Sequence, residues 1–255
     1  MAKNTTDDRL TIAALGVLAM CLTTIDHEVI GHGSACLIGG GEIVHISTTL
    51  FACTRPSPWV AAGGPFFDLF AGLAAWLIGR TIPAQKVDWR LFFAAMTAFS
   101  LFWESGYLVK AMLGQDGDLY FFARAMLGQP EMTWRIIGGA IGAVIFLATI
   151  RISEANFLAA IPNAGRARSA ARTIWVVASV GAIVAALAFK GDFWSNLRDA
   201  ALEIGLAACP LLLIARRGPE VDAPVVARNW AVIGFAACLF IVFAATIGHG
   251  LGSFS

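Results

Sequence analysis

Long apolar runs separated by short polar segments cover most of the chain. A membrane-spanning helix needs about 20 mainly apolar residues. The next-to-last run is short, but its flanking arginines can extend towards the membrane surface. We therefore predict an all-α polytopic membrane protein with a single membrane domain over residues 1–255. It has about seven transmembrane helices, at 10–30, 60–79, 91–110, 133–151, 173–190, 200–215 and 230–248.

One segment between the runs has a different period. In "GEIVHISTTLF" (41–51), many side chains are β-branched, and those of residues 43, 45 and 47 would point to one face of a strand and those of 44, 46 and 48 to the other. This pattern is typical of a strand. We expect one short β-strand or a hairpin after the first helix.

Composition agrees with a membrane protein. Of the 255 residues 58% are hydrophobic and only 14% are charged, against roughly 25% charged in soluble domains. The mean hydropathy is +0.74. The net charge of +1 gives no reason to expect a nucleic acid partner. The expected surroundings are the lipid bilayer.

Basic residues are unevenly distributed between the two sides of the predicted bundle. Twelve of the eighteen Lys and Arg residues lie on the side of the N-terminus. Basic residues favour the cytoplasmic side, so we expect a cytoplasmic N-terminus. The twelve are Lys3, Arg9, Arg80, Lys86, Arg90, Arg151, Arg166, Arg168, Arg172, Arg216, Arg217 and Arg228.

The five cysteines are scattered and form no Cys-x-x-Cys pair. Four of them lie within apolar runs. We expect them to act as small hydrophobic residues, rather than as metal ligands or as an obligatory disulfide.

Several ionisable residues interrupt the apolar runs. Such residues are costly in a membrane and usually face the interior of the bundle or a water-filled cavity. Some could instead hydrogen-bond one another and form a buried polar cluster without a metal. They are Asp26, His27, Glu28, His32, Asp68, Glu104 and Glu203.

The spacing of His27 and His32 leaves two ways to build a metal site. Residues five apart on a regular α-helix point about 140° away from each other, so the two imidazoles would diverge. A π-bulge would absorb the extra residue and bring the histidines together, with Glu28 beside them as base. In a regular helix, Glu28 and His32 would be the ligands, and Val29 would stand where a catalytic Glu is needed.

Three segments, in order along the chain, resemble a known family. "DHEVIGHGSACLIGGGEIVHIS" (26–47) resembles the metal-binding helix and following strand of the site-2 proteases, which are intramembrane zinc metallopeptidases. "VAAGGPFFDLFAGLAAW" (60–76) resembles their Ala-Gly-Pro-x-x-Asn helix. "ESGYLVKAMLGQDGDL" (104–119) is similar to a Gly-Tyr-Leu…Gly-Asp segment of bacterial members. The resemblance covers about residues 15–125.

This resemblance implies one zinc ion and a substrate helix within the membrane. It assigns His27, His32 and Asp118 as ligands, with Asp116 the nearest rival for the third, and Glu28 as the catalytic base. It further implies a metallopeptidase-like core over 10–125, additional helices over 130–255, and a bacterial inner-membrane location. The strand at 43–48 would offer an edge to an extended substrate segment.

Two departures from the family pattern bear on activity. One residue more separates His27 from His32 than separates the two histidines of the family's His-Glu-x-x-His motif. In addition, Asp68 stands where Asn is usual in the second motif. Asp68 and Glu104 are expected beside the ligands or as gate residues. The alternatives are a non-catalytic membrane subunit of the same fold, acting through a partner helix, and a small ion- or proton-coupled transporter. The transporter would use Asp68, Glu104 and Glu203, converging away from His32.

Overall fold

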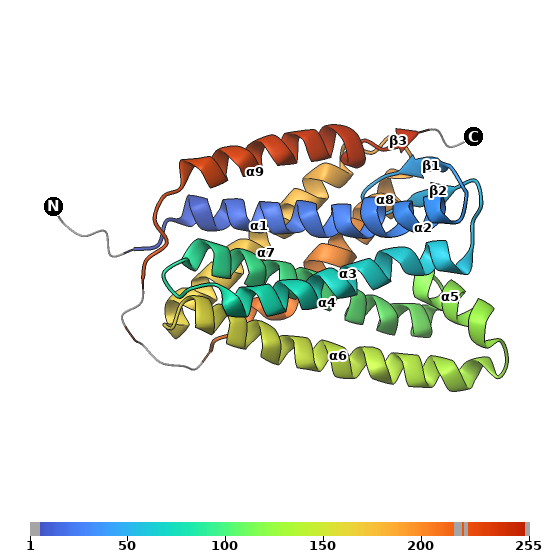
Figure 1. Cartoon of the computed structure of the whole chain (residues 1–255), viewed down its shortest axis with the longest axis horizontal. Helices are drawn as coiled ribbons and strands as arrows, with labels where there is room; N and C mark the ends of the chain where they lie inside the picture. The colour runs from blue at the N-terminus through green and yellow to red at the C-terminus, as the bar shows by residue number, and fades with distance from the viewer. Residues whose placement is uncertain (1–5, 217–220, 222–223, 253–255) are drawn as a thin grey trace.

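The computed structural model describes residues 6–216, 221 and 224–252 (Figure 1). Most elements are helices that lie along the long axis of the molecule. In chain order they are α1 Arg9–Thr24, η1 Ile25–His32, α2 Gly33–Ile38, β1 Ile43–Ile46, β2 Phe51–Cys53, α3 Pro58–Thr81, α4 Val87–Gly114, α5 Asp118–Leu127, α6 Glu131–Ala160, α7 Ala164–Ala186, α8 Phe193–Ala200, η2 Ala201–Leu206, η3 Cys209–Leu212, α9 Trp230–Phe243, η4 Ala244–Gly248 and β3 Leu251–Gly252.

Within the described residues, six helices, not seven, are long and apolar enough to cross a membrane. This finding indicates an integral membrane protein. The six are Arg9–Ile38, Pro58–Thr81, Val87–Gly114, Glu131–Ala160, Ala164–Ala186 and Trp230–Gly248.

The predicted span at 200–215 is wrong as a single helix. It is divided into the π-helix η2 and the 3₁₀-helix η3, because Pro210 cannot continue an α-helix. The segment nevertheless runs from one end of the bundle to the other. Asn196 hydrogen-bonds Thr49 beside the sheet, whereas the N–H of Ala215 donates to Glu154 near the far end of α6.

Helices α6 and α7 are also longer than predicted. The connection between them is reduced to 161–163, although the sequence indicated a loop over 151–172. Asn163 ends this connection by accepting a hydrogen bond from the N–H of Arg166, which caps α7.

Hydrogen bonds tie the N-terminal segment to distant connections at the same end of the bundle. Asp7 pairs with Arg166 at 2.7 Å, and the N–H of Asp8 donates to the carbonyl of Val226. Arg90 donates to the carbonyl of Ala159. The predicted grouping of these connections is therefore seen in the fold, although Lys3 and Arg217 lie outside the described residues.

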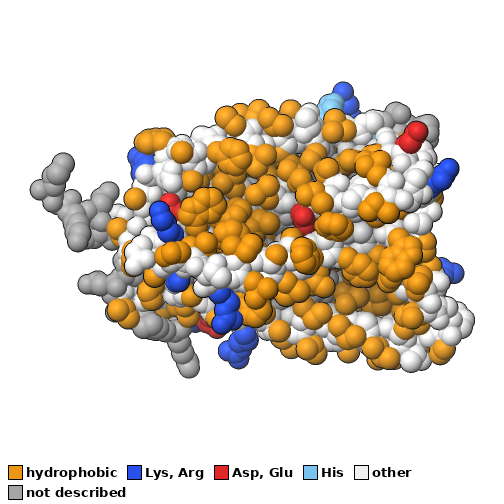
Figure 2. Space-filling view, in the orientation of Figure 1, with side chains coloured by type: hydrophobic (Ala, Val, Ile, Leu, Met, Phe, Trp, Pro, Cys, Tyr) orange, Lys and Arg blue, Asp and Glu red, His pale blue; other side chains and the backbone are white. Residues whose placement is uncertain are grey.

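Burial differs strongly between the helices. In the apolar stretch of each helix that could cross a membrane, 67% of the residues of α4 are buried but only 17% of those of α6. Figure 2 shows hydrophobic side chains over the middle of one face, with Lys and Arg mainly towards its two ends. This distribution fits a central α4 surrounded by helices with one face towards lipid.

The predicted hairpin is present, and the sheet is larger than expected. Strand β1 pairs antiparallel with β2 on one side and with β3 on the other, in the order β2-β1-β3. The expectation that the strand at 43–48 offers a free edge is therefore wrong, since β1 is the central strand. Among the described strands, β2 has an outer edge.

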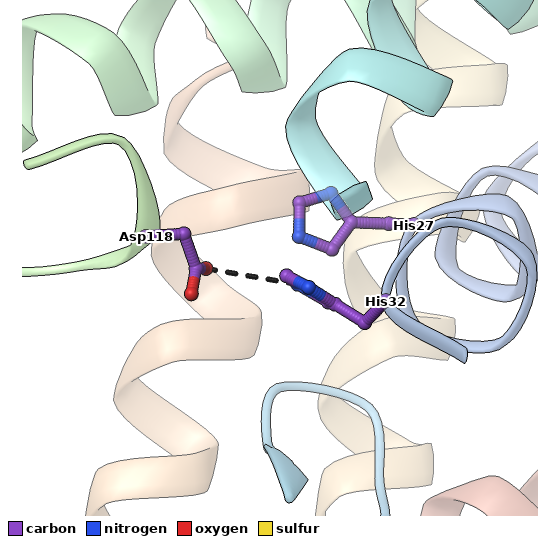
Figure 3. Close-up of side chains that lie close together, drawn as sticks. All are labelled: His27, His32 and Asp118. Atoms are coloured by element: carbon purple, nitrogen blue, oxygen red, sulfur yellow. Dashed lines mark ion pairs between the residues drawn. The ribbon is translucent and has the colours of Figure 1, made fainter. Parts of the chain in front are cut away.

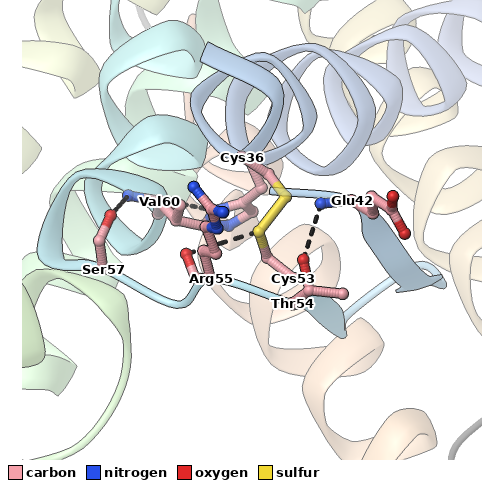
Figure 4. The surroundings of a disulfide bond; sticks show 8 residues. Cys36, Glu42, Cys53, Thr54, Arg55, Ser57 and Val60 are labelled. Atoms are coloured by element: carbon pink, nitrogen blue, oxygen red, sulfur yellow. Dashed lines mark hydrogen bonds between the residues drawn. A yellow bond between two sulfur atoms is a disulfide. The ribbon is translucent and has the colours of Figure 1, made fainter. Parts of the chain in front are cut away.

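A disulfide joins Cys36, at the end of the first long helix, to Cys53 in β2 (Figure 4). The expectation of small hydrophobic cysteines without an obligatory disulfide is wrong for this pair. Gly41 makes room for the bond, because a Cβ there would lie 2.5 Å from the Cys53 sulfur. The disulfide fixes β2 against the helix that carries the histidines.

Candidate metal centre

The first long helix changes its winding where the ionisable residues occur. Residues Ile25–His32 form a π-helix between the α-helical segments α1 and α2. Hydrogen bonds in a π-helix run between residues five apart, so residues at that spacing lie on the same face. The ring centroids of His27 and His32 are consequently 4.9 Å apart. Of the two arrangements that the sequence left open, the bulged helix is the one observed.

Both histidine rings are held through their Nδ1 atoms. The Nδ1 of His27 lies 3.0 Å from Oε1 of Glu104, and its ring stacks on Trp103. The Nδ1 of His32 lies 2.7 Å from the carbonyl oxygen of Val60. An Nδ1–H that donates to a carboxylate or carbonyl fixes the tautomer and leaves Nε2 as a ligand atom.

Asp118 completes the group from another part of the chain. Its Oδ2 lies 3.7 Å from Nε2 of His32, and Figure 3 shows its carboxylate directed at the two rings. The Tyr107 hydroxyl donates to the Asp118 carboxylate and accepts from the Asp118 N–H, both at 3.0 Å. Tyr107 therefore positions Asp118 at the start of α5.

The potential ligand atoms of His27, His32 and Asp118 all lie within 4.8 Å of one another. Two ligands of a tetrahedral zinc ion, each about 2.0–2.1 Å from the metal, are separated by roughly 3.4 Å. The group therefore has side chains of the right kind, close enough together, that it could hold a metal ion.

Gly64 keeps open the space in front of both histidines. A Cβ at this position would lie 2.6 Å from Nε2 of His27 and would collide with Nε2 of His32. The crossing of η1 and α3 is close at this point because Gly31 faces Gly63 and Gly64 without side chains. Both Nε2 atoms thus converge on one small space.

Glu28 faces a cavity of about 460 Å³ that also contacts His32, Asp118 and β2. The residue is buried, and its Oε2 has no hydrogen-bond partner among the described residues. A carboxylate without a partner, beside a cavity and a ligand group, is available to hold a proton.

A second group of possible ligands lies on the other side of His27. It consists of His27 itself, Asp68 and Glu104, all of them buried. Asp68 is 0% exposed and its Oδ2 lies 3.7 Å from Nδ1 of His27. The transporter alternative expected Asp68 and Glu104 away from His32, but both lie against the neighbouring His27.

The remaining candidates lie apart from the three-residue group. Asp116 is exposed, and its Oδ1 accepts from the N–H of Gly117, so it turns away from the histidines. Glu203 lines a different cavity together with Trp103 and Lys110.

Comparison with protein-family models, curated proteins and solved structures found no match for this chain.

Several residues of the site were not assigned from the sequence. Val60 acts through its carbonyl, which no side-chain pattern reveals. Trp103 is one of many aromatic residues in apolar runs. Tyr107 and Gly64 lie inside the segments that carry the family resemblance. The motifs therefore indicated that these residues belong to the site, but did not indicate what each of them does.

Proposed function

We propose that this protein is an intramembrane zinc metallopeptidase. One observation carries the proposal: the π-helix brings His27 and His32 together, with Asp118 across from them. The extra residue in the His-Glu-x-x-x-His segment was the main departure from the site-2 protease pattern. The π-helix compensates for it and keeps Glu28 next to the ligands, which supports the resemblance.

His27, His32 and Asp118 would hold the zinc ion. When bound, the ion would supply Lewis-acid polarisation of the scissile carbonyl and would lower the pKa of water. Glu28 would accept a proton from the attacking water and deliver it to the leaving amine. Glu104 and Val60 would keep both imidazoles in the required orientation, and Tyr107 would do the same for the Asp118 carboxylate.

The proposed substrate is a membrane-embedded segment that becomes extended at the site. The outer edge of β2 is available for such a segment, and Phe51, Ala52 and Cys53 of β2 line the cavity. A substrate strand added to β2 would gain main-chain hydrogen bonds while it passes His32 and Asp118.

The disulfide supports an orientation for the site. Disulfides persist on the oxidising side of a membrane, and Cys53 lines the cavity itself. The opposite end carries most of the Lys and Arg residues, which favour the cytoplasm. Both arguments support the proposal of a cytoplasmic N-terminus and a cavity that opens towards the oxidising compartment.

The test combines metal content with proteolysis. Protein purified in detergent without chelators is analysed by mass spectrometry for metal, and is incubated with fluorescent casein and single-span membrane peptides. We expect about one zinc per chain and cleavage in the wild type. His32→Ala loses both, and Glu28→Gln keeps the zinc but loses cleavage.

The same experiment separates the alternatives. Zinc that is lost in Glu28→Gln but kept in His27→Ala would mean the other ligand set. Zinc without cleavage of any substrate would favour a non-catalytic subunit. Asp116→Asn is the matched control, because this carboxylate turns away from the site, and it should change neither readout.

A further inference from the structure

A further, unrelated cavity lies at the opposite end of the bundle, between the start of α1 and residues 165–177 of α7. Its volume is about 500 Å³, and Arg9, Arg168 and Arg172 line it together with the hydroxyl residues Ser169 and Thr173. The disulfide and the candidate metal centre are at the other end, so the proposed peptidase does not use this cavity.

No carboxylate lines this cavity among the described residues. The acidic residues nearby are already paired, Asp7 with Arg166 and Asp8 with Arg228. The cavity lining therefore contains no carboxylate that would neutralise the three guanidinium groups, and the cavity is positively charged. A low-dielectric surrounding strengthens their attraction for an anion.

The arginines keep donor capacity for a ligand. Arg168 uses Nε and Nη2 on the carbonyl of Ala215, and Arg172 uses Nε on the carbonyl of Leu212. The Nη groups of Arg172 make no other described hydrogen bond, and Arg9 is exposed at the first position of α1. Guanidinium groups bind phosphate oxygens through paired N–H donors.

The lower part of the cavity is apolar. Val176 and Val177 lie about one helical turn beyond Arg172 in α7, and Val176 is 45% exposed. Arg172 lies eight residues into α7, or about 12 Å along the helix axis. The cavity thus has charged groups towards the end of the bundle and apolar side chains further along α7, which is the arrangement that an amphiphilic ligand needs.

We propose that this cavity binds an anionic phospholipid from the cytoplasmic leaflet. The phosphate lies between Arg9 and Arg172, and an acyl chain follows Val176 along α7. A free phosphate ion shares the headgroup chemistry but would not use the apolar wall. Because Arg168 and Arg172 also donate to the carbonyls of Ala215 and Leu212, the lipid would lie beside the end of the broken segment.

The test measures lipid retention by native mass spectrometry of the full chain in detergent. The probes are phosphatidylglycerol, phosphatidylcholine and inorganic phosphate. We expect phosphatidylglycerol to bind at least fivefold more tightly than phosphatidylcholine. Arg9→Gln should weaken it about fivefold, which corresponds to about 1 kcal/mol per basic residue. Arg9→Lys should retain it, since the charge remains.

Arg124→Gln is the matched control, because it removes an exposed arginine from α5 at the other end. It should leave the preference unchanged. Equal binding of the two lipids, or an equal effect of both arginine variants, would overturn the proposal. Displacement of phosphatidylglycerol by millimolar inorganic phosphate would identify the free anion as the ligand and would also overturn it. None of these readouts depends on zinc or proteolysis.

Discussion

His27 and His32 are five positions apart in the chain, yet their ring centroids are only 4.9 Å apart because a π-helix joins them. If the π-helix absorbs a single extra residue, its removal should be tolerated. Deletion of Ile30, which is 45% exposed, leaves His-Glu-Val-Gly-His on a regular helix. We expect this variant to retain about one zinc per chain by mass spectrometry.

A deletion elsewhere in the same helix provides the contrast. Removal of Val17, from the regular part of α1, rotates the following residues by about 100° relative to the residues before it. Zinc should then be lost. If both deletions lose zinc equally, the π-helix is not the compensating element.

Gly64→Ala should abolish metal binding without unfolding the protein. The added methyl group would occupy the space in front of the Nε2 atoms of His27 and His32. Zinc content should fall to the background level. The thermal midpoint of the metal-free protein should also fall, because the added methyl group meets the two buried imidazoles whether or not a metal is bound, but the protein should remain folded. Gly234→Ala is the control, since a Cβ there meets nothing within 4 Å. Full zinc content in Gly64→Ala would contradict the ligand geometry.

Tyr107→Phe tests whether Tyr107, which is not itself a proposed ligand, sets the position of the proposed ligand Asp118. The change removes both hydrogen bonds between the hydroxyl and Asp118. Loss of such a supporting partner typically weakens metal affinity 10- to 100-fold. Competition with a zinc chelator measures the dissociation constant. Phe122→Leu, at the aromatic surface near Trp59, should leave it unchanged.

The disulfide should contribute substantially to stability. It joins Cys36 to Cys53, 17 positions further along the chain, and disulfides that close loops of this size contribute about 3 kcal/mol. Cys53→Ser should lower the thermal midpoint by roughly 6–12 °C in detergent. Treatment with a reductant should lower the thermal midpoint of the wild-type protein by a similar amount. Cys238→Ser, a free cysteine, serves as the control and should have no effect.

Asp7 should make stability depend on acid pH. Burial raises the pKa of this carboxyl, but the hydrogen bonds from Arg166 and Val226 outweigh it, so the pKa lies below its ordinary value. Its contribution is complete above the unfolded pKa of about 3.9 and disappears as pH falls through the folded pKa. Asp7→Asn should therefore lower the free energy of unfolding at pH 7 by about 1.5–3 kcal/mol.

That difference should shrink as the pH falls below about 4, because the wild-type carboxyl then becomes neutral as well. Glu42→Gln, an exposed carboxylate at the other end, should show no difference at either pH. A constant effect of Asp7→Asn from pH 7 to pH 3 would mean that packing, not charge, is lost.

Much of the site followed from chemistry that is visible in the sequence. Ionisable residues are rare in apolar runs, so His27, His32 and Glu104 stood out. Helical geometry then left two possible metal sites, one formed by His27 and His32 and the other by Glu28 and His32. The choice between those cases depends on contacts with other helices, which only the three-dimensional structure shows. A π-helix forms where packing favours it, here where Gly31 meets Gly63 and Gly64, and one sequence does not display that contact.

Other features depended on partners that are distant in the chain. Cys36 and Cys53 look like ordinary apolar residues until the hairpin turns back towards the helix. Strand β3 has only two residues, too few for an alternating pattern. The segment at 200–215 has the composition of a span, but Pro210 and the π-helix η2 divide it.

The pairing of β1 with β3 also has a consequence for biosynthesis. Strand β1 leaves the ribosome early, whereas β3 is made only after α9, and contacts so far apart in sequence form slowly. A nascent chain would already contain His27, His32 and Asp118, but the sheet behind the cavity would lack a strand. The sheet is therefore complete only after the final helix has been translated.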